Sequence, residues 1–274
     1  MPTTPCRFCG ATDQKITNEH VWPEWLEDFV PPSAGPGYAE RWSSADGRQE
    51  WKQQLLSATV RMFCEPCNTG WMSDIEGAAK HIVGPMVQGI PTMLDAAAQR
   101  SVANWAVLKG LVAAQTSKTP QPIPDRHFRR VCAAKGAPAN TVWVWIGQRQ
   151  NLAHPTKPGR AKLFDSHFMP VTNAERKDSL DGDLEKKYIS EGGVFNGMIF
   201  SVGHFFALVV QHDWPGLQFR PIQGSDAEQA FVSIWPVGDD VPWPPPLPVD
   251  VLGDTHHVTQ FFEMGLPLVR VYGP

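Results

Sequence analysis

Residues 64–76 read CEPCNTGWMSDIE, and together with residues 6–10, CRFCG, they decide how the first third of the chain is expected to fold. Each stretch holds two cysteines separated by two residues, first Cys6 and Cys9, then Cys64 and Cys67. Structural Zn²⁺ is commonly held by four such thiolates in a closed tetrahedron, at Zn–S distances of about 2.3 Å. Two pairs therefore predict a structural zinc site, with residues 10–63 folded as an excursion between them. The alternative is four buried cysteines without a metal.

The composition favours a soluble, cytoplasmic protein. Of the 274 residues, 42% are hydrophobic, and no run of about 18 uncharged apolar residues is long enough to cross a bilayer. The first ten residues hold neither a basic start nor an apolar stretch, so we expect no secretory signal and no membrane partner. In a reducing compartment, close cysteine pairs are more readily metal ligands than disulfides. The fifth cysteine, Cys132, is expected to be a small core residue.

Charge is distributed unevenly along the chain. The net formal charge is −5 over residues 1–99, +8 over residues 100–187 and −7 over residues 188–274. A chain that is acidic overall binds nucleic acid only through a local basic surface. The candidates for such a surface share one side of a helix and are Arg126, Arg129 and Arg130. They could meet successive phosphates or simply form a solvated helix face, and the sequence leaves both open.

The pattern of apolar residues predicts an α+β protein with two units, residues 1–92 and residues 93–274. Helices are expected from Met72 to a stop or kink at Gly84-Pro85, over 101–117 and over 125–134. Two strands, 38–44 and 49–56, are expected to form a hairpin around Asp46-Gly47. Short β-rich runs follow over 141–147, 197–211, 217–222 and 229–235. Residues 31–37 and 172–193 are expected to be loops, and the prolines of residues 242–248 predict a stiff surface segment.

A second motif lies between the two cysteine pairs. Residues 15–26 read KITNEHVWPEWL, where a short strand is expected to lead into Glu19 and His20 before Pro23 ends the regular backbone. Asn68 follows the last cysteine of the second pair and opens a helix. In this combination, residues 6–90 resemble the HNH endonuclease superfamily, in particular bacterial and phage proteins with an EHxxPxWL segment followed by CxxCNxGWMxxxE.

The resemblance implies a zinc-stabilised ββα-metal (HNH) module in the first unit and a mixed α+β domain in the second. Carried over from the family, Glu19 and Asn68 would be ligands of a catalytic divalent ion, Mg²⁺ or Mn²⁺, and His20 would be the general base. Oxygen ligands suit such hard ions, and a histidine can remove a proton from water near neutral pH. The implied activity is hydrolysis of phosphodiester bonds in DNA, and zinc would take no part in the reaction.

One feature departs from the family pattern. Many HNH proteins have a middle asparagine that orients the general base, but Thr59 stands at that place and residues 21–67 contain no asparagine. Three functions therefore remain in competition. The first is an active endonuclease, the second is a catalytically degenerate HNH module that binds nucleic acid or protein, and the third is a nuclease controlled by a regulatory partner.

Several other side chains near the motif have an ordinary structural interpretation. Asp74 and Glu76 lie in the first turns of a helix, where acidic groups favour the helix dipole, so we expect capping rather than metal binding. Lys109, on an apolar helix face, could extend to solvent or reach a phosphate. The tryptophans of the motif are expected to pack in the core rather than stack on bases, and they are Trp22, Trp25 and Trp71.

Overall fold

A seven-stranded sheet forms the centre of the computed structural model, which describes residues 4–30, 38–43, 47–52, 58–116, 123–153, 164–171, 195–213, 218–253 and 261–265. In spatial order its strands are β11 (Val232–Trp235), β6 (Val142–Gln148), β9 (Phe205–His212), β8 (Phe195–Val202), β7 (Phe164–Val171), β2 (Tyr38–Ser43) and β3 (Gly47–Lys52). Neighbouring strands run antiparallel except for the parallel pair β2 and β7.

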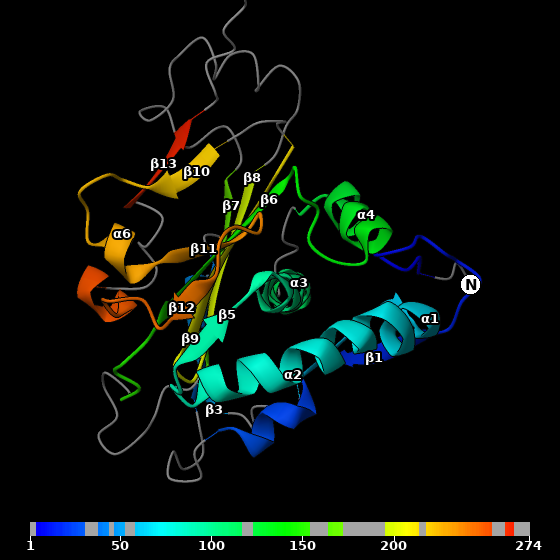
Figure 1. Ribbon diagram of the computed structural model, residues 1–274. Helices are drawn as coiled ribbons and strands as arrows, with labels where there is room; N and C mark the ends of the chain where they lie inside the picture. The colour runs from blue at the N-terminus through cyan, green and yellow to red at the C-terminus, as the bar shows by residue number, and fades with distance from the viewer. Residues whose placement is uncertain are drawn as a thin grey trace, which may run out of the picture.

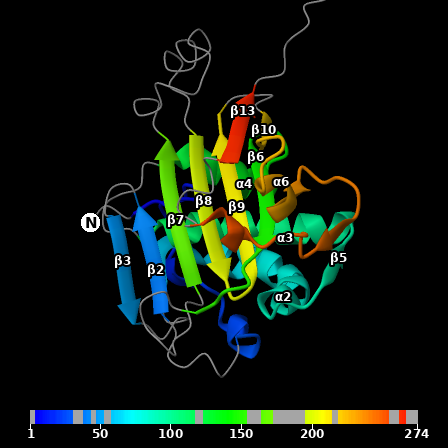
Figure 2. The same cartoon turned by 90° about the vertical axis from the view of Figure 1, so that its left-hand side faces the viewer.

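Different elements cover the two faces of this sheet (Figures 1 and 2). One face carries the helices α2 (Ser73–Val87), α3 (Ala96–Ala114) and α4 (Asp125–Ala134). The other carries the short helix α6 (Ala227–Ala230) and the strand pair β10 (Gln218–Pro221) and β13 (Phe262–Gly265). None of the helices in the described ranges has the length and apolar character needed to span a membrane. The combination of a mainly antiparallel sheet with separate helices confirms the predicted α+β class.

The hairpin of β8 and β9 supplies side chains to both hydrophobic layers, because successive residues of a strand point to opposite faces. Phe200 packs on the helix side, where its ring centroid lies 5.8 Å from that of Trp105 on α3. Its neighbour Ile199 belongs to the opposite layer, together with Phe206 and Phe231. A strand buried on both faces reads as a continuous apolar run, which explains the composition of residues 197–211.

The β-rich run predicted over residues 197–211 is confirmed, and a tight turn at Gly203-His204 divides it into β8 and β9. Gly203 has a φ of +54°, a conformation that side chains with a Cβ rarely adopt. A Cβ at this position would also lie 2.4 Å from the carbonyl oxygen of Val87. The turn is held by His204, whose N–H donates to Val87 O at 3.0 Å, so it rests against the end of α2.

The first third of the chain folds around a strand pair of its own. β1 (Ile16–His20) runs antiparallel to β4 (Thr59–Cys64), and the chain then continues through α1 (Glu65–Cys67) and an irregular helical turn, η3 (Asn68–Met72), into α2. The hairpin of β2 and β3 instead extends the large sheet. Phe63 and Trp105 belong to the same hydrophobic core, so the two sides of residue 92 are packed together. The division into two units stays a prediction.

Other expected elements are close to the observed ones. The helix expected over 125–134 coincides with α4, whereas α3 begins five residues before the expected start because the Asp95 side chain accepts a hydrogen bond from Ala98 N at 2.8 Å and caps it. Expected segments 31–37 and 172–193 lie outside the described residues. Elements without a sequence prediction include the strands β4, β7 and β13. They also include η1 (Glu24–Asp28), β5 (Thr92–Leu94), β12 (Val241–Trp243) and η4 (Val249–Leu252).

Two expectations about proline need correction. α2 continues through Pro85 and ends at Val87, because a proline in the last turn removes few hydrogen bonds from the helix. Gly84 has a packing role there, since a Cβ would lie 2.5 Å from the ring of Phe29. The proline-rich segment 242–248 is not wholly at the surface, because Trp243 is buried and donates its indole N–H to Gly147 O at 3.1 Å.

Replacing Gly203 with alanine should lower the free energy of unfolding more than the same change at Gly224. Both glycines have positive φ, at +54° and +77°, but a Cβ at Gly224 meets nothing within 4 Å. Both substitutions should therefore introduce similar backbone strain. The additional contact with Val87 O should lower the free energy of unfolding of Gly203→Ala by about 2 kcal/mol more than that of Gly224→Ala. Urea denaturation of both variants measures the difference, and equal losses would contradict the close approach of the turn to α2.

Candidate functional site

The four cysteines of the two pairs meet in one cluster. The sulfur atoms of Cys6, Cys9, Cys64 and Cys67 all lie within 4.8 Å of one another. Cys9 Sγ and Cys64 Sγ lie 3.6 Å apart. A tetrahedral zinc site with Zn–S distances of about 2.3 Å places its sulfurs about 3.8 Å apart. The four cysteines could therefore hold a zinc ion, as their spacing in the sequence predicts.

The environment of the four thiols is consistent with metal binding. Burial raises the pKa of Cys64 to about 11 and raises that of Cys67, although the Trp71 side chain acts in the opposite direction on Cys67. Burial also acts to raise the pKa of Cys6, but backbone hydrogen bonds, including the one from Cys64 N at 3.3 Å, bring it below its usual value. Buried thiols that resist losing a proton become thiolates when a bound cation supplies the compensating charge.

Cys132 does not belong to the four-sulfur cluster but lies next to it. It is partly buried on α4, and its thiol interacts with that of Cys67. Burial raises the pKa of Cys132, which keeps this thiol protonated. The prediction of a small packing residue fits this position, and Cys132 offers a matched control for experiments on the four cysteines.

The three residues expected to perform catalysis come together beside this cluster. Glu19 and His20 end β1, and Asn68 begins the irregular turn η3 directly after the last cysteine. All three line one hollow of about 420 Å³. A bulge in the pairing of β1 with β4, between Thr17 and Glu19, shifts the strand register just before the two residues. Glu19 is buried, whereas the side chain of His20 is 40% exposed.

The amide of Asn68 has a defined orientation. Its Nδ2 donates hydrogen bonds to Thr17 Oγ1 at 3.1 Å and to the carbonyl oxygen of Asn18 at 3.0 Å. These two bonds use both protons of the amide nitrogen and leave Oδ1 as the atom that can accept a hydrogen bond or bind a cation. The side chain thus offers an oxygen ligand from a rigid position.

A buried ion cluster lies behind the hollow, and the sequence analysis did not predict it. The ammonium group of Lys109 contacts Glu19 Oε1 at 2.8 Å and His20 O at 3.0 Å, and it forms an ion pair with Glu76. Lys109 is fully buried and does not extend to solvent. Burial raises the pKa of Glu19, against the opposing effect of the Lys109 charge. In the sequence, the only indication of this cluster was a lysine within the apolar stripe of α3.

Glu76 lines the same hollow as Glu19, His20 and Asn68. Its expected role as a residue that merely favours the helix dipole is therefore incomplete, because its carboxylate faces Lys109. Two carboxyl groups therefore face one ammonium group at this hollow. Their oxygens, together with the amide oxygen of Asn68, are a donor set that fits a hard divalent cation.

His20 has a different neighbour from the one the family pattern would supply. Its strand partner is Thr59, which stands in place of the missing asparagine. Its Nε2 lies 3.5 Å from the carboxylate of Glu24 in the following turn. Glu24 lines the same hollow as His20.

The tryptophans of the motif pack as expected. Trp22 is buried against Phe200, with ring centroids 5.4 Å apart, and Trp71 contacts Phe8 at 4.9 Å. Trp25 is only partly buried, because it both packs against Trp105 at 6.0 Å and lines the hollow. The core interpretation therefore accounts for all three rings.

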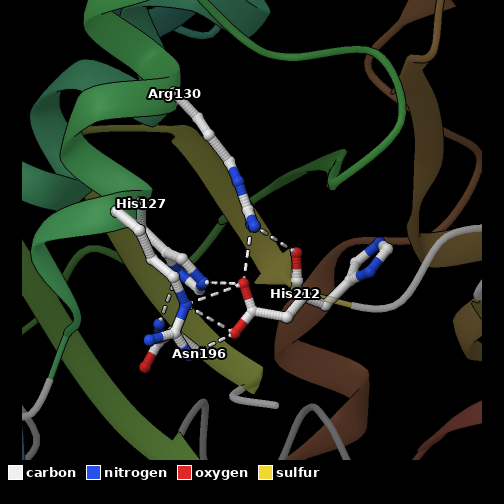
Figure 3. Close-up of polar contacts among 6 residues, drawn as sticks. His127, Arg130, Asn196 and His212 are labelled. Atoms are coloured by element: carbon white, nitrogen blue, oxygen red, sulfur yellow. Dashed lines mark hydrogen bonds and ion pairs between the residues drawn. The ribbon is translucent and has the colours of Figure 1, made fainter. Parts of the chain in front are cut away.

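The three arginines of α4 have neighbours within the protein, and Figure 3 shows Arg130 in the polar network beside β9. Arg126 Nε and Arg130 Nη1 both contact the carboxylate of Asp213, at 3.0 Å and 2.7 Å. Arg129 reaches instead toward Gly10, so that its guanidinium group occupies the place a Cβ would take there. Two of the three guanidinium groups thus share one carboxylate, and the third covers the first cysteine turn. Binding of phosphates by these arginines stays a prediction.

His127 lies at the buried side of the same network (Figure 3). Its Nε2 is 3.0 Å from Asp213 Oδ1, and its Nδ1 is 2.9 Å from Asn196 Nδ2. Since the Asn196 amide donates to Nδ1, the ring proton of the neutral form resides on Nε2 and points to Asp213. Burial lowers the pKa of His127, in spite of the opposing effect of Asp213. The network therefore requires a neutral ring.

Comparisons with models of protein families, with curated proteins and with solved structures find no match to this chain. The resemblance to the HNH superfamily accordingly stays a prediction from sequence motifs. What the geometry adds is that the residues of the motif share one hollow, next to four cysteines that could hold a metal ion.

The stability of the protein should fall below about pH 6.5 through His127. The unfolded histidine binds a proton near pH 6.5 while the folded one does so only at lower pH, so this contribution is complete above that value and is lost as the pH falls toward the folded pKa. His127→Gln should remove this contribution. The free energy of unfolding should then decrease less steeply with falling pH, by up to about 1.4 kcal/mol per pH unit.

Urea denaturation at pH 7.5 and pH 5.5 compares wild type, His127→Gln and the control His81→Gln, which changes an exposed histidine. The control should lose as much stability as wild type. An equal loss in His127→Gln would show that His127 titrates alike in the folded and unfolded states.

Proposed function

We propose that the protein is a divalent-metal-dependent endonuclease of the HNH type, which hydrolyses phosphodiester bonds of DNA and contains a structural zinc ion. The observation that carries the proposal is the gathering of Glu19, His20 and Asn68 around one hollow next to the cysteine cluster. An acid, a base and an amide oxygen at one opening are the groups that metal-assisted hydrolysis of a phosphodiester requires.

Each of these residues has a role that its position supports. Glu19 and Asn68 Oδ1 would hold a Mg²⁺ or Mn²⁺ ion, which when bound offsets the charge of the phosphate and of the leaving oxygen. His20, half-exposed at the end of β1, would remove the proton from the attacking water. The zinc ion, held by the four cysteines, would keep β4 and the start of the helix in place relative to the N-terminal turn.

A second function has its own support in the structure. One oxygen of Glu19 is engaged by Lys109, and the middle asparagine of the family pattern is missing. Both features suit a catalytically degenerate module, in which the zinc-stabilised part binds nucleic acid or a protein partner without cleavage. A nuclease that a regulatory partner switches on stays the third possibility.

Purified protein should contain about one tightly bound zinc ion per chain. Four thiolates in one cluster couple metal binding to folding with a free energy on the order of 10 kcal/mol. Cys64→Ser should therefore lose the zinc and unfold the N-terminal third, while Cys132→Ser, next to the cluster, should keep both. Elemental analysis and circular dichroism measure the two effects, and zinc-free, folded wild type prepared without chelators would refute the structural zinc.

His20→Ala should lower plasmid cleavage with Mg²⁺ or Mn²⁺ by about 10²–10⁴-fold, the range that a general base contributes. Its zinc content and fold should be unchanged, because His20 acts only in the chemical step. Glu19→Ala and Asn68→Ala should require more divalent ion for the same rate. His81→Ala, which changes an exposed histidine of α2, is the control and should cleave like wild type.

The outcomes separate the candidate functions. Cleavage by His20→Ala at the wild-type rate would remove His20 from the mechanism. A wild-type protein that binds DNA in a gel-shift assay but never cleaves it would favour the degenerate binding module.

A further inference from the structure

Lys109 places a positive charge where the proposed function requires a metal ion. It extends from α3 into the interior, is fully buried and contacts the carboxylates of both Glu19 and Glu76. A buried ammonium group is costly unless it is paired and hydrogen-bonded. The two carboxylates and the carbonyl oxygen of His20 meet this requirement. The lysine thus has a full set of partners before any metal ion binds.

The same carboxylates that satisfy Lys109 also line the hollow. A divalent ion bound to Glu19 would therefore share its ligand with an ammonium group 2.8 Å from one of the carboxylate oxygens. Two cations at one carboxylate repel each other, and inside a protein this repulsion is screened much less than in water. Lys109 must accordingly weaken the affinity of the hollow for a divalent ion.

We propose that Lys109 is a built-in counter-ion that competes with the divalent ion for the carboxylates of Glu19 and Glu76 and thereby keeps the metal affinity of the site low. This inference rests on the proposed function, because it takes the hollow to be the divalent-metal site. Lys109 is also a positioning residue, since it holds Glu19 and the backbone of His20 by hydrogen bonds. It touches neither substrate nor ion.

The consequence is a site that prefers to bind its metal together with a phosphate. The negative charge of a bound phosphodiester adds to that of Glu19 and Glu76, and it compensates the repulsion from Lys109. Free protein at cellular ion concentrations would then carry little divalent metal in the hollow, and cleavage would depend on ion and nucleic acid arriving together.

The two roles of Lys109 predict opposite effects of its removal. If the residue only supported the structure, Lys109→Met would disorder Glu19 and weaken metal binding. If it is a competing counter-ion, the same change relieves the repulsion and strengthens metal binding. The sign of the change in affinity therefore decides between the two.

The experiment is a titration of the full-length, zinc-loaded protein with Mn²⁺ alone, followed by calorimetry or by the electron paramagnetic resonance signal of the free ion. Mn²⁺ does not displace zinc from thiolates, because it is the weaker-binding and harder ion. Lys109→Met should bind Mn²⁺ at least tenfold more tightly than wild type, whereas Lys109→Arg, which keeps the charge, should stay within about threefold, well below the effect of losing a nearby charge.

The control is Lys80→Met. Lys80 forms a comparable ion pair with Asp28 at 3.1 Å, but at the surface and outside the hollow. Its removal changes the net charge of the protein by the same amount and should leave the Mn²⁺ affinity unchanged. An affinity gain in Lys80→Met equal to that in Lys109→Met would overturn the inference.

A second comparison covers the case in which Lys109→Met does not fold. Glu76→Gln and the double variant Lys109→Met/Glu76→Gln differ only in the lysine, and the double variant leaves one carboxylate without its ammonium partner where Lys109→Met leaves two. The double variant should bind Mn²⁺ at least tenfold more tightly than Glu76→Gln. Equal or weaker binding would overturn the inference.

Glu19→Gln separates failure of this inference from failure of the proposed function. If neither wild type nor the Lys109 variants bind Mn²⁺ in a way that Glu19→Gln abolishes, the divalent-metal site itself is wrong, and both proposals fall. If wild type binds Mn²⁺ through Glu19 but Lys109→Met does not bind it more tightly, only the counter-ion role is wrong and the proposed function stands.

Discussion

The ion cluster around Lys109 is the interaction on which the rest of the candidate site depends. One ammonium group joins the end of β1, through Glu19 and the carbonyl oxygen of His20, to α2 through Glu76. It does so from α3, the helix that packs on the central sheet (Figure 1). A buried charge that loses one partner is strongly destabilised, so the three elements are held at a fixed separation. The cluster thus ties β1 and α2, which both line the hollow, to α3.

A second polar network, only partly buried, fixes the position of α4. Asp213, which follows β9, binds Arg126, His127 and Arg130 of α4 and so fixes this helix on the sheet. The same helix reaches the cysteine cluster, where Arg129 lies against Gly10 and Cys132 lies beside Cys67. The arrangement explains how a metal site made of two short turns can be supported by a helix from the second half of the chain.

Local patterns predicted those features that neighbouring residues decide. The helix over residues 125–134, the hairpin of β2 and β3 and the short strand before Glu19 follow from periodicity and turn residues, and all are present. The turn at Gly203 was missed, because a strand buried on both faces has no polar residue to mark where it reverses. The role of Gly84 was missed for a similar reason, since only the ring of Phe29, distant in sequence, requires a residue without a side chain.

The sequence by itself determined the chemical types of the candidate site: four cysteines in two close pairs, then an acid, a histidine and an asparagine at defined places beside them. These types follow from spacing along the chain, which is short for each pair. Only the tertiary structure decided which charges meet. Lys109 is 90 residues from Glu19 in sequence, and Asp213 is 87 residues from Arg126. A charged side chain on a helix has the same appearance in the sequence whether it faces solvent, a phosphate or a buried carboxylate, because its partner is chosen by packing of elements that are far apart in the chain.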